Sequence, residues 1–375
     1  MEWFKIFCLI ILGLYTIFIV VNAFVLLFST AQTDISESYI PETSVTIIIP
    51  ARNEEKAILT CLEGISSQDF PDDLLQILIV DDHSEDNTKR IAEKFCEKDP
   101  VRRLLLSLTN TAGKKQAILH GIENATGKII ITRDADTFTE SRQWLKNIVS
   151  HFENTNCDLL ISPVLINSNN SFNDAFQQFE SLAISALGMS MAKMKRPFVC
   201  SGANLAYKKE TFLKVHPYFD NLSTASGDDM FLLKKFYGLK FKIQPNTSRE
   251  SIVCTPAEIS LQKMLSQRLR WASKSVKTNT FPIFFTGLLV LIMNALCLPV
   301  LCLGFINGFY LSFSLFTLTL KFIFDFLLLF LSARMYKQKV NWLWFLPAFL
   351  FNGFYVPAII LATPFIKPNW KSREV

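Results

Sequence analysis

Long uncharged apolar segments at both ends of the chain restrict its fold more than any other feature. The segment Ile6–Phe28 carries no charged side chain, and no charge occurs between Thr278 and Lys321. A helix rises about 1.5 Å per residue, so segments of this length can cross the roughly 30 Å of hydrocarbon in a bilayer. The first segment exceeds the roughly 7–15 apolar residues of a cleaved signal peptide, so we expect a retained anchor.

The C-terminal apolar region is too long for one span and breaks naturally between Gly304 and Gly308. Three spans are predicted there, near Phe281–Leu303, Phe309–Leu331 and Trp342–Ile366. Tryptophans 342, 344 and 370 fall where an aromatic belt is expected. Lys321 and Asp325 are four residues apart and can pair on one helical face. We interpret them as a neutralised structural pair, with an ion or substrate path as the alternative.

Charge around the spans predicts the orientation of the chain. Residues 263–277 carry five basic side chains and no acid, which places the middle of the chain in the cytoplasm by the positive-inside rule. The basic loop at residues 334–339 then also falls inside. Two features oppose this orientation, namely the basic tail (Lys367, Lys371, Arg373) and the acids after the first span (Asp34, Glu37, Glu42). A re-entrant C-terminal segment is the alternative, and the plasma (inner) membrane is the expected location.

Charge and cysteine content exclude several other classes of protein. The net charge is only +5, and no basic tract of the kind that binds nucleic acid is present. The eight cysteines form no Cys-x-x-Cys pair, and the four histidines form no His-Glu-x-x-His motif. A disulfide framework and a structural zinc site are therefore not expected, and free thiols are.

Between residues 44 and 250, apolar runs alternate with helix-like stretches. The predicted strands are Val45–Ile49, Ile77–Val80, Arg103–Leu106, Lys128–Thr132 and Asp158–Val164. The predicted helices are Glu54–Ser67, Glu85–Lys98, Lys114–Asn124 and Ser141–Glu153. This alternation is typical of an α/β fold with a mostly parallel, doubly wound sheet flanked by helices. Such sheets bind ligands beyond the carboxyl ends of their strands.

Acidic side chains follow three of these strands. Val45–Pro50 runs into an Arg-Asn-Glu-Glu segment, Ile79–Val80 into Asp81-Asp82, and Ile129–Arg133 into Asp134-Ala-Asp136. One such acid is most simply a helix cap, but three polar strand ends at one sheet edge indicate a site. An extended backbone would point the carboxylates of Asp134 and Asp136 the same way, so that both could bind Mg²⁺ or Mn²⁺. No glycine-rich phosphate loop is present, so a diphosphate would be held through the metal.

Two further motifs follow. Asp228-Asp229 precedes a predicted helix over Met230–Tyr237, where the acids either cap the helix or supply a general base. Gln267, Arg270, Trp271 and Lys274 share one helical face, and the apolar face opposite holds Leu261, Leu265, Leu269, Ala272 and Val276. This pattern predicts an amphipathic helix on the bilayer with its polar side toward the predicted α/β domain. A basic anchor is the alternative, but it does not explain the Gln and Trp.

Seven segments, in this order, carry a resemblance to a known family. The sequence is similar to membrane-bound family 2 glycosyltransferases with a GT-A fold, the group that holds cellulose, hyaluronan and poly-N-acetylglucosamine synthases and ceramide glucosyltransferase. The segments are IIIPARNEE, VDDHSEDNT, GKKQAILHGI, Asp134-Ala-Asp136, Gly202-Ala-Asn204, Gly227-Asp-Asp229 and Gln267-Arg-Leu-Arg270-Trp271. The chain departs from the family pattern where GKKQAIL stands for GKAGALN and Asp228 for Glu.

The resemblance implies a reaction and a set of site residues. The reaction is a single displacement, with inversion, from a nucleotide-diphosphate sugar (a UDP- or GDP-sugar). Asp229 would be the catalytic base, and Asp228 would either orient it or raise its pKa by like-charge repulsion. Asp134 with Asp136 would hold the divalent cation. The residues expected to bind the nucleotide sugar are Pro50, Arg52, Glu54, Asp81, Asp82, Lys114, Asp134, Gln267, Arg270 and Trp271.

The expected organisation has four parts: an anchor (1–30), a glycosyltransferase domain (44–255), an interface helix (256–278) and about three spans (279–366). The predicted function is transfer of a sugar to a lipid-linked acceptor at the cytoplasmic face, because the spans are mostly apolar and offer few polar groups for a tunnel. A processive polysaccharide synthase is the first alternative. A non-enzymatic assembly or transport subunit is the second, and the intact acids argue against it.

Overall fold

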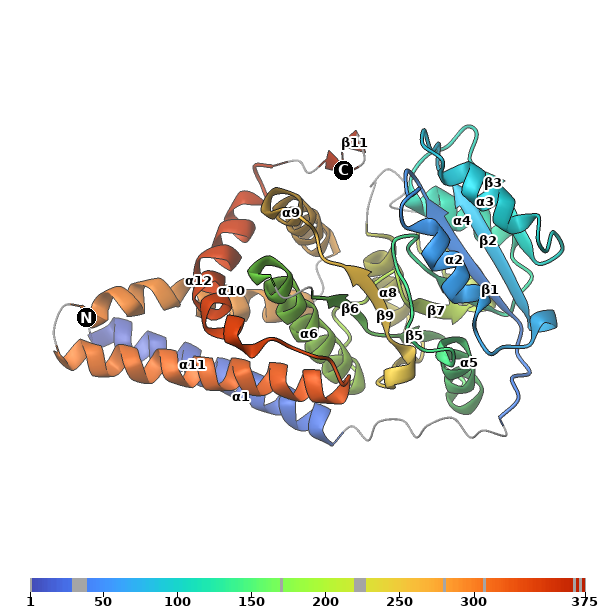
Figure 1. The fold of residues 1–375 in the computed structure, drawn as a ribbon. Coiled ribbons are helices and arrows are strands. Elements are labelled where there is room, and N and C mark those ends of the chain that lie inside the picture. The colour runs from blue at the N-terminus through green and yellow to red at the C-terminus, as the bar shows by residue number, and fades with distance from the viewer. Residues whose placement is uncertain are drawn as a thin grey trace. The chain divides into compact units, whose positions relative to one another are not determined.

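The computed structural model describes residues 2–28, 39–168, 171–218, 227–278, 281–305, 308–366, 369–370 and 373–374. Asp34, Glu37, Lys367 and Lys371, which entered the orientation argument, lie outside the described residues. The chain divides into a helical unit (residues 1–29, 168–191 and 257–368) and a sheet unit (residues 30–167, 192–256 and 369–375), coloured along the chain in Figure 1. Residues 168–191 thus group with the terminal helices, although the sequence analysis assigned them to the glycosyltransferase domain.

The sheet unit is built on a seven-stranded sheet of order β3-β2-β1-β4-β7-β5-β8. The first four strands in the chain, β1 to β4, lie side by side in parallel. β7 is antiparallel to both of its neighbours, and β5 pairs in parallel with β8. The strand bounds are β1 Val45–Ala51, β2 Leu75–Asp81, β3 Arg103–Ser107, β4 Ile129–Thr132, β5 Leu159–Ile161, β7 Leu205–Lys208 and β8 Ile243–Pro245.

One expected strand is wrong in its extent. Asp158–Val164 was predicted as a single strand, but β5 ends at Ile161 and a new strand, β6 (Val164–Asn167), pairs with β9 (Val253–Pro256) in a separate two-stranded sheet. Pro163 lies between the two strands and has no N–H to donate to a ladder, which explains the break. A further short pair, β10 (Asn369–Trp370) with β11 (Arg373–Glu374), lies near the C-terminus.

Helices pack on both faces of the parallel strands. One face, with Ile47 and Ile49 of β1, packs in a core with Leu62 of α2 and Trp144 of α5. On the other face α4 lies against β1 and β2. β1 is buried except at Pro50, which fits its almost continuous apolar sequence. The helices of this unit are α2 Ile58–Ser66, α3 Thr88–Cys96, α4 Lys114–Asn124, α5 Trp144–Thr155, α7 Lys209–Val215 and α8 Asp228–Gly238, with 3₁₀ turns at Asp72–Leu74 and Arg249–Ser251. The four predicted helices of this region are confirmed, α4 with the predicted bounds.

The helical unit contains the four predicted spans. Within the described residues, four helices are long and apolar enough to cross a membrane. They belong to α1 (Glu2–Leu27), α10 (Phe281–Gly304), α11 (Gly308–Met335) and α12 (Phe345–Ala362), the last preceded by a 3₁₀ turn at Trp342–Trp344. The unit also holds α6 (Phe172–Lys193), which the sequence analysis did not predict, and α9 (Leu261–Thr278), which it did.

The predicted Lys321–Asp325 pair is confirmed inside α11. Lys321 Nζ lies 2.6 Å from Asp325 Oδ2, and Tyr15 of α1 donates a hydrogen bond of 2.6 Å to Asp325 Oδ1. The ammonium also lies 4.7 Å from the centre of the Phe349 ring of α12. These contacts link α1, α11 and α12 through one neutralised pair, in agreement with the structural interpretation.

Candidate active site

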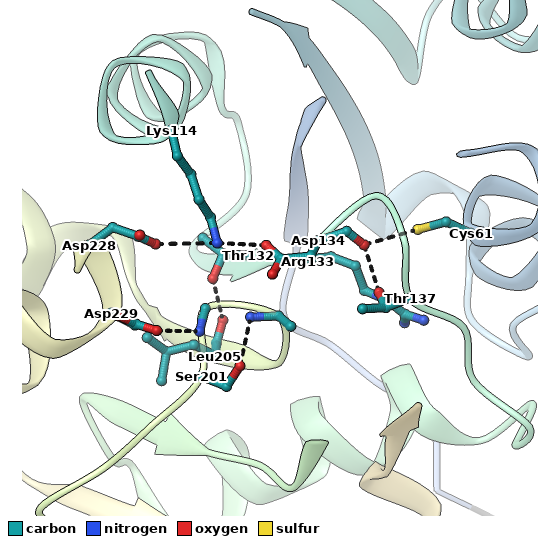
Figure 2. A network of polar contacts seen from close by, with 12 residues as sticks. Cys61, Lys114, Thr132, Arg133, Asp134, Thr137, Ser201, Leu205, Asp228 and Asp229 are labelled. Carbon is teal, nitrogen blue, oxygen red and sulfur yellow. Dashed lines mark hydrogen bonds and ion pairs between the residues drawn. The ribbon is translucent and has the colours of Figure 1, made fainter. Parts of the chain in front are cut away.

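The ends of β4 and β7 bring two chain segments to one edge of the sheet. In the antiparallel pairing of these strands, Thr132 at the end of β4 lies opposite Leu205 at the start of β7. The residues that follow Thr132 and those that precede Leu205 therefore leave the sheet together, as Figure 2 shows. The first segment holds the Asp134-Ala-Asp136 triplet, and the second holds Gly202-Ala-Asn204.

Lys114 joins the acidic triplet to the second acidic pair. It is the first residue of α4, and its ammonium lies 2.6 Å from Asp134 Oδ1 and 3.6 Å from Asp228 Oδ2. Figure 2 shows the Lys114 side chain reaching down from α4 between these two carboxylates. Burial opposes the charge of this amine, but Asp134, Asp228 and Asp229 outweigh it and raise the pKa of Lys114 above its ordinary value. The amine is therefore a permanent cation among carboxylates.

Asp229 is held by backbone N–H groups at the start of α8. Its Oδ2 accepts a hydrogen bond of 3.2 Å from the N–H of Gly202, and its Oδ1 accepts one of 2.8 Å from the N–H of Met230. Asp228 is buried, whereas Asp229 is only half-buried. The pair thus offers one fixed, accessible carboxylate beside one that faces Lys114.

Gly202 allows these groups to approach one another. A Cβ at this position would lie 2.9 Å from Asp228 Oδ2, 3.1 Å from Lys114 Nζ and 3.7 Å from the Cβ of Asp229. Contacts between real Cβ atoms and their neighbours are ordinarily 3.4 Å or longer. No side chain therefore fits at residue 202 without moving the charged groups.

The acidic triplet lies in a turn and not in the extended backbone that the sequence analysis assumed. β4 ends at Thr132, residues 135 and 136 form a turn, and Thr137 donates to the Asp134 carbonyl through both its N–H (3.3 Å) and its hydroxyl (2.6 Å). The Cys61 thiol also donates to this carbonyl, at 3.6 Å, and burial raises its pKa to about 11. The two carboxylates are therefore positioned by this turn and not by alternation along a strand.

The acidic turn suits a divalent cation that is shared with a substrate. Among the described residues, no three or more His, Cys, Asp or Glu side chains gather closely enough to hold a metal alone. Asp134 and Asp136 are both half-buried on one turn, so their carboxylates can be reached from solvent. Mg²⁺ commonly binds one or two carboxylates and completes its shell with substrate phosphates. The donor set fits that mode of binding and does not fit a closed metal site.

The residues expected near the nucleoside hold one another at the ends of β1 and β2. Arg52 donates to the Asp82 carbonyl (3.2 Å), and Asp82 Oδ2 accepts from the N–H of Gly113, directly before α4 (3.0 Å). Asp81 accepts from the N–H of Ser84 at 3.4 Å. The buried Asp81 and Asp82 thus shape the loops. Pro50 and Glu54 are half-buried at the same strand end, and the N–H of Glu54 donates 2.7 Å to Thr88 Oγ1.

The Gln-x-x-Arg-Trp motif lies on α9, in the helical unit. Gln267 and Arg270 are half-buried and Trp271 is 36% exposed. Gln267 Nε2 donates to Glu258 Oε1 at 3.1 Å. The predicted apolar face is not uniform, because Leu261 is exposed whereas Leu269 is buried within the protein.

Two residues that hold the site in place, Gly202 and Arg133, were not predicted from the sequence. Gly202 was quoted only as part of a motif, yet the lack of a side chain there is what the site requires. Arg133, next to Asp134, is fully buried, donates through Nε to Thr137 Oγ1 (2.9 Å) and stacks on Trp144 at 4.7 Å. A charged residue directly after a buried strand was the available signal, because such a residue must find partners inside the protein.

Comparison with known proteins identifies a family for the segment that carries most of these residues. Residues 46–215 match the family described as "Glycosyl transferase family 2". "Glycosyltransferase AglE" of Haloferax volcanii is 29% identical over 217 residues, which cover 57% of this chain and 67% of AglE. Human "dolichyl-phosphate beta-glucosyltransferase" is 34% identical over 110 residues, 27% of this chain and 33% of that protein.

A further relative and a solved structure are among the other proteins that are similar to the chain. One is the Methanococcus voltae "dolichyl N-acetyl-alpha-D-glucosaminyl phosphate 3-beta-D-2,3-diacetamido-2,3-dideoxy-beta-D-glucuronosyltransferase". It is 32% identical over 109 residues, which cover 29% of this chain and 34% of that protein. The other is a solved structure, titled "Mannosyltransferase PcManGT from Pyrobaculum calidifontis in complex with GDP-Man and Mn2+". It matches with a TM-score of 0.58 at 18% identity and covers 96% of both chains, which shows a common fold.

The matched segment and the fold agree on one class, the glycosyltransferases with a GT-A fold. Residues 46–215 form a glycosyl transferase family 2 domain, and the apolar helices α1, α10, α11 and α12 accompany it in the same chain. The predicted family, fold class and enzymatic activity are confirmed.

Proposed function

We propose that this chain is a membrane-bound inverting glycosyltransferase that moves one or a few sugars from a UDP- or GDP-sugar to a lipid-linked acceptor at the cytoplasmic face of the plasma (inner) membrane. The observation that carries the proposal is the meeting of Lys114, Asp134, Asp228 and Asp229 at one sheet edge. Inverting transfer needs a base on one side of the sugar and positive charge at the leaving diphosphate. These four side chains offer both within one site.

Asp229 is the base in this proposal. The acceptor hydroxyl loses its proton as its oxygen attacks the anomeric carbon, and a carboxylate within about 2.6–3.2 Å can take that proton. The N–H groups of Gly202 and Met230 hold the Asp229 carboxylate in place, and its half-buried position leaves it accessible to an acceptor. Asp228 orients the pair through its contact with Lys114.

Lys114, with Asp134 and Asp136, receives the diphosphate. The Lys114 ammonium is a permanent donor that can form charge-assisted hydrogen bonds with phosphate oxygens. Asp134 and Asp136 would hold Mg²⁺ or Mn²⁺, which neutralises the charge that collects on the leaving diphosphate. Arg270 contributes a second cation, Gln267 and Trp271 contact the sugars, and Pro50, Arg52, Glu54, Asp81 and Asp82 form the side that binds the nucleoside.

Two observations support a lipid acceptor. Two relatives bear names that state a dolichyl-phosphate or dolichyl-linked acceptor. In the described part of the chain, the four candidate spans are dominated by apolar side chains, and the charged pair inside α11 is already neutralised. A polymer that is extruded through the membrane needs a polar path, and these helices supply few groups for one.

The test is a transfer assay with product analysis. Protein in detergent micelles would be incubated with labelled UDP-glucose, UDP-N-acetylglucosamine or GDP-mannose, together with polyprenyl phosphate, and Asp229→Asn would serve as the inactive control. We expect one organic-soluble glycolipid whose anomeric linkage is opposite to that of the donor. A water-soluble ladder reaching long polymer would refute the lipid acceptor, and retention of configuration would refute the single displacement.

A further inference from the structure

Arg268 occupies the first variable position of the Gln-x-x-Arg-Trp motif on α9 and is not one of the three residues that define the motif. Its side chain is only 5% exposed, which is unusual for a guanidinium on an amphipathic helix. It pairs with Glu180 of α6, where Nη2 lies 2.8 Å and Nε 3.2 Å from Glu180 Oε2. Both residues belong to the helical unit.

The same guanidinium contacts two of the three motif side chains. Arg268 Nη1 donates to Gln267 Oε1, and the guanidinium carbon lies 4.5 Å from the centre of the Trp271 ring. A guanidinium is planar and carries five N–H donors, so a single group can hold a carboxylate, an amide oxygen and an aromatic face together. A lysine ammonium, as a point charge, cannot reproduce this geometry.

α6 also supports Gln267 indirectly, through Glu258. The backbone of Glu258 is fixed by α6, because its N–H donates to Gln177 Oε1 (2.9 Å) and its carbonyl accepts from Gln177 Nε2 (3.0 Å) and Asn173 Nδ2 (2.7 Å). The Glu258 side chain in turn accepts from Gln267 Nε2 at 3.1 Å. Both ends of the Gln267 amide are therefore held by groups that α6 supports.

A helix contact alone does not require this arrangement. Removing two charges from water is costly, and an apolar pair of similar volume usually joins two helices at least as well as a buried ion pair. Burial raises the pKa of Glu180 despite the opposing effect of Arg268, in keeping with that cost. The ion pair does provide a fixed direction for the guanidinium, and through it for Gln267 and Trp271.

We propose that Arg268, held by Glu180, is the positioning residue that sets the orientation of Gln267 and Trp271 for sugar transfer. This inference rests on the proposed function, in which those two side chains contact the sugars. Arg268 itself acts through its neighbours and is not placed against the substrate.

The main test replaces both charges, so that no buried ion is left unpaired. In the variant Glu180→Leu with Arg268→Met, we expect the melting temperature in detergent to stay within about 3 °C of wild type, while kcat falls roughly 10- to 100-fold. The single variant Arg268→Lys keeps a cation opposite Glu180 but loses the fork, and we expect a kcat loss of about tenfold. Lys263→Ala, an exposed basic residue on the same helix, should retain the wild-type rate.

A double-mutant cycle separates positioning from a purely structural role. In a Gln267→Ala, Trp271→Ala background, the paired replacement has nothing left to orient, so its further effect on kcat should be less than about twofold. Independent, multiplying losses would overturn the inference, as would a wild-type kcat for Arg268→Lys. If the Gln267→Ala, Trp271→Ala background itself keeps the full transfer rate, the proposed role of the motif fails, and the inference fails with it.

Discussion

Adding a single methyl group at Gly202 tests the geometry of the carboxylate site directly. The φ angle of Gly202 lies outside the left-handed region, so alanine can adopt the same backbone conformation. The only new contact is steric, because the added Cβ would meet Asp228 Oδ2 at 2.9 Å and Lys114 Nζ at 3.1 Å. Gly202→Ala therefore perturbs the two charged groups and leaves their chemistry intact.

The size of the effect follows from these distances. An ordinary contact of 3.4 Å requires Asp228 Oδ2 to move by about 0.5 Å and Lys114 Nζ by about 0.3 Å. Displacement by 1 Å can cost about 10²-fold in rate, so we expect kcat to fall about tenfold. Overpacking lowers the free energy of unfolding by about 1–3 kcal/mol. Alanine also lowers the conformational entropy of the unfolded chain, which raises the free energy of unfolding by about 0.4–1 kcal/mol. The net loss of stability should therefore be near about 1 kcal/mol.

The assay compares Gly202→Ala with a matched substitution in the same helix as Asp228. Gly238 ends α8, and a Cβ there would meet nothing within 4 Å, so Gly238→Ala should keep the wild-type kcat. Both variants would be measured at saturating donor and acceptor, with melting temperatures recorded in the same detergent. A wild-type kcat for Gly202→Ala would refute the claim that catalysis depends on the position of Asp228.

Three further outcomes are expected. Asp229→Asn should abolish transfer, because the base acts on the acceptor. The affinity for the donor, measured by calorimetry, should change less than about threefold. A lost donor affinity with a normal rate at saturation would contradict this role. Chelation should remove activity, and excess Mg²⁺ or Mn²⁺ should restore it. Asp136→Ala should raise the metal concentration that is needed for half-maximal activity. Full turnover in excess chelator would contradict a role of Asp134 and Asp136 in metal binding. Burial lowers the pKa of His151 on α5 from 6.5 to about 4, so below pH 6.5 the unfolded chain takes up a proton that the folded chain does not. The free energy of unfolding should then be about 2 kcal/mol smaller at pH 5 than above pH 7, and His151→Gln should lack most of this decrease in urea titrations; equal pH dependence of the two proteins would contradict it.

Segments with a strong local pattern could be predicted from the sequence. The spans are long and uncharged, and β1 to β4 are apolar runs separated by helices with clear periodicity, so their order and type were predicted correctly. α4 begins directly after Gly113, whose φ of 105° only glycine adopts readily, and its bounds match the prediction.

Elements that depend on distant partners could not be predicted. β7 has only four residues, and its pairing with β4 and β5 joins segments that are far apart in the chain. α6 was missed although it is 22 residues long, because its polar residues are used inside the protein, as with Glu180 and Gln177. A pattern that assigns polar residues to solvent cannot identify such a helix.

The candidate site also combines features that could be predicted from the sequence with features that could not. Its acids could be chosen from the sequence because they follow strands or open a helix. Their contacts could not, since the 2.6 Å approach of Lys114 to Asp134 and the need for Gly202 beside Asp228 depend on the β4–β7 pairing. Arg268 shows the same limit, because its importance depends on a partner 88 residues away.

The balance of charge in the site links the acids to the need for a metal. The carboxylates of Asp134, Asp136, Asp228 and Asp229 are accompanied by Lys114 in direct contact and by Arg133 behind the turn. Four acids and two cations give the site an excess of negative charge, which repels a diphosphate. This repulsion is large because the groups are partly removed from water. Lys114 already serves two carboxylates, so it cannot by itself reverse the sign of the site. A divalent cation at Asp134 and Asp136 would allow the acidic turn to bind the diphosphate. In the proposed function, the site that supplies Asp229 as the base therefore also requires a metal to bind the donor.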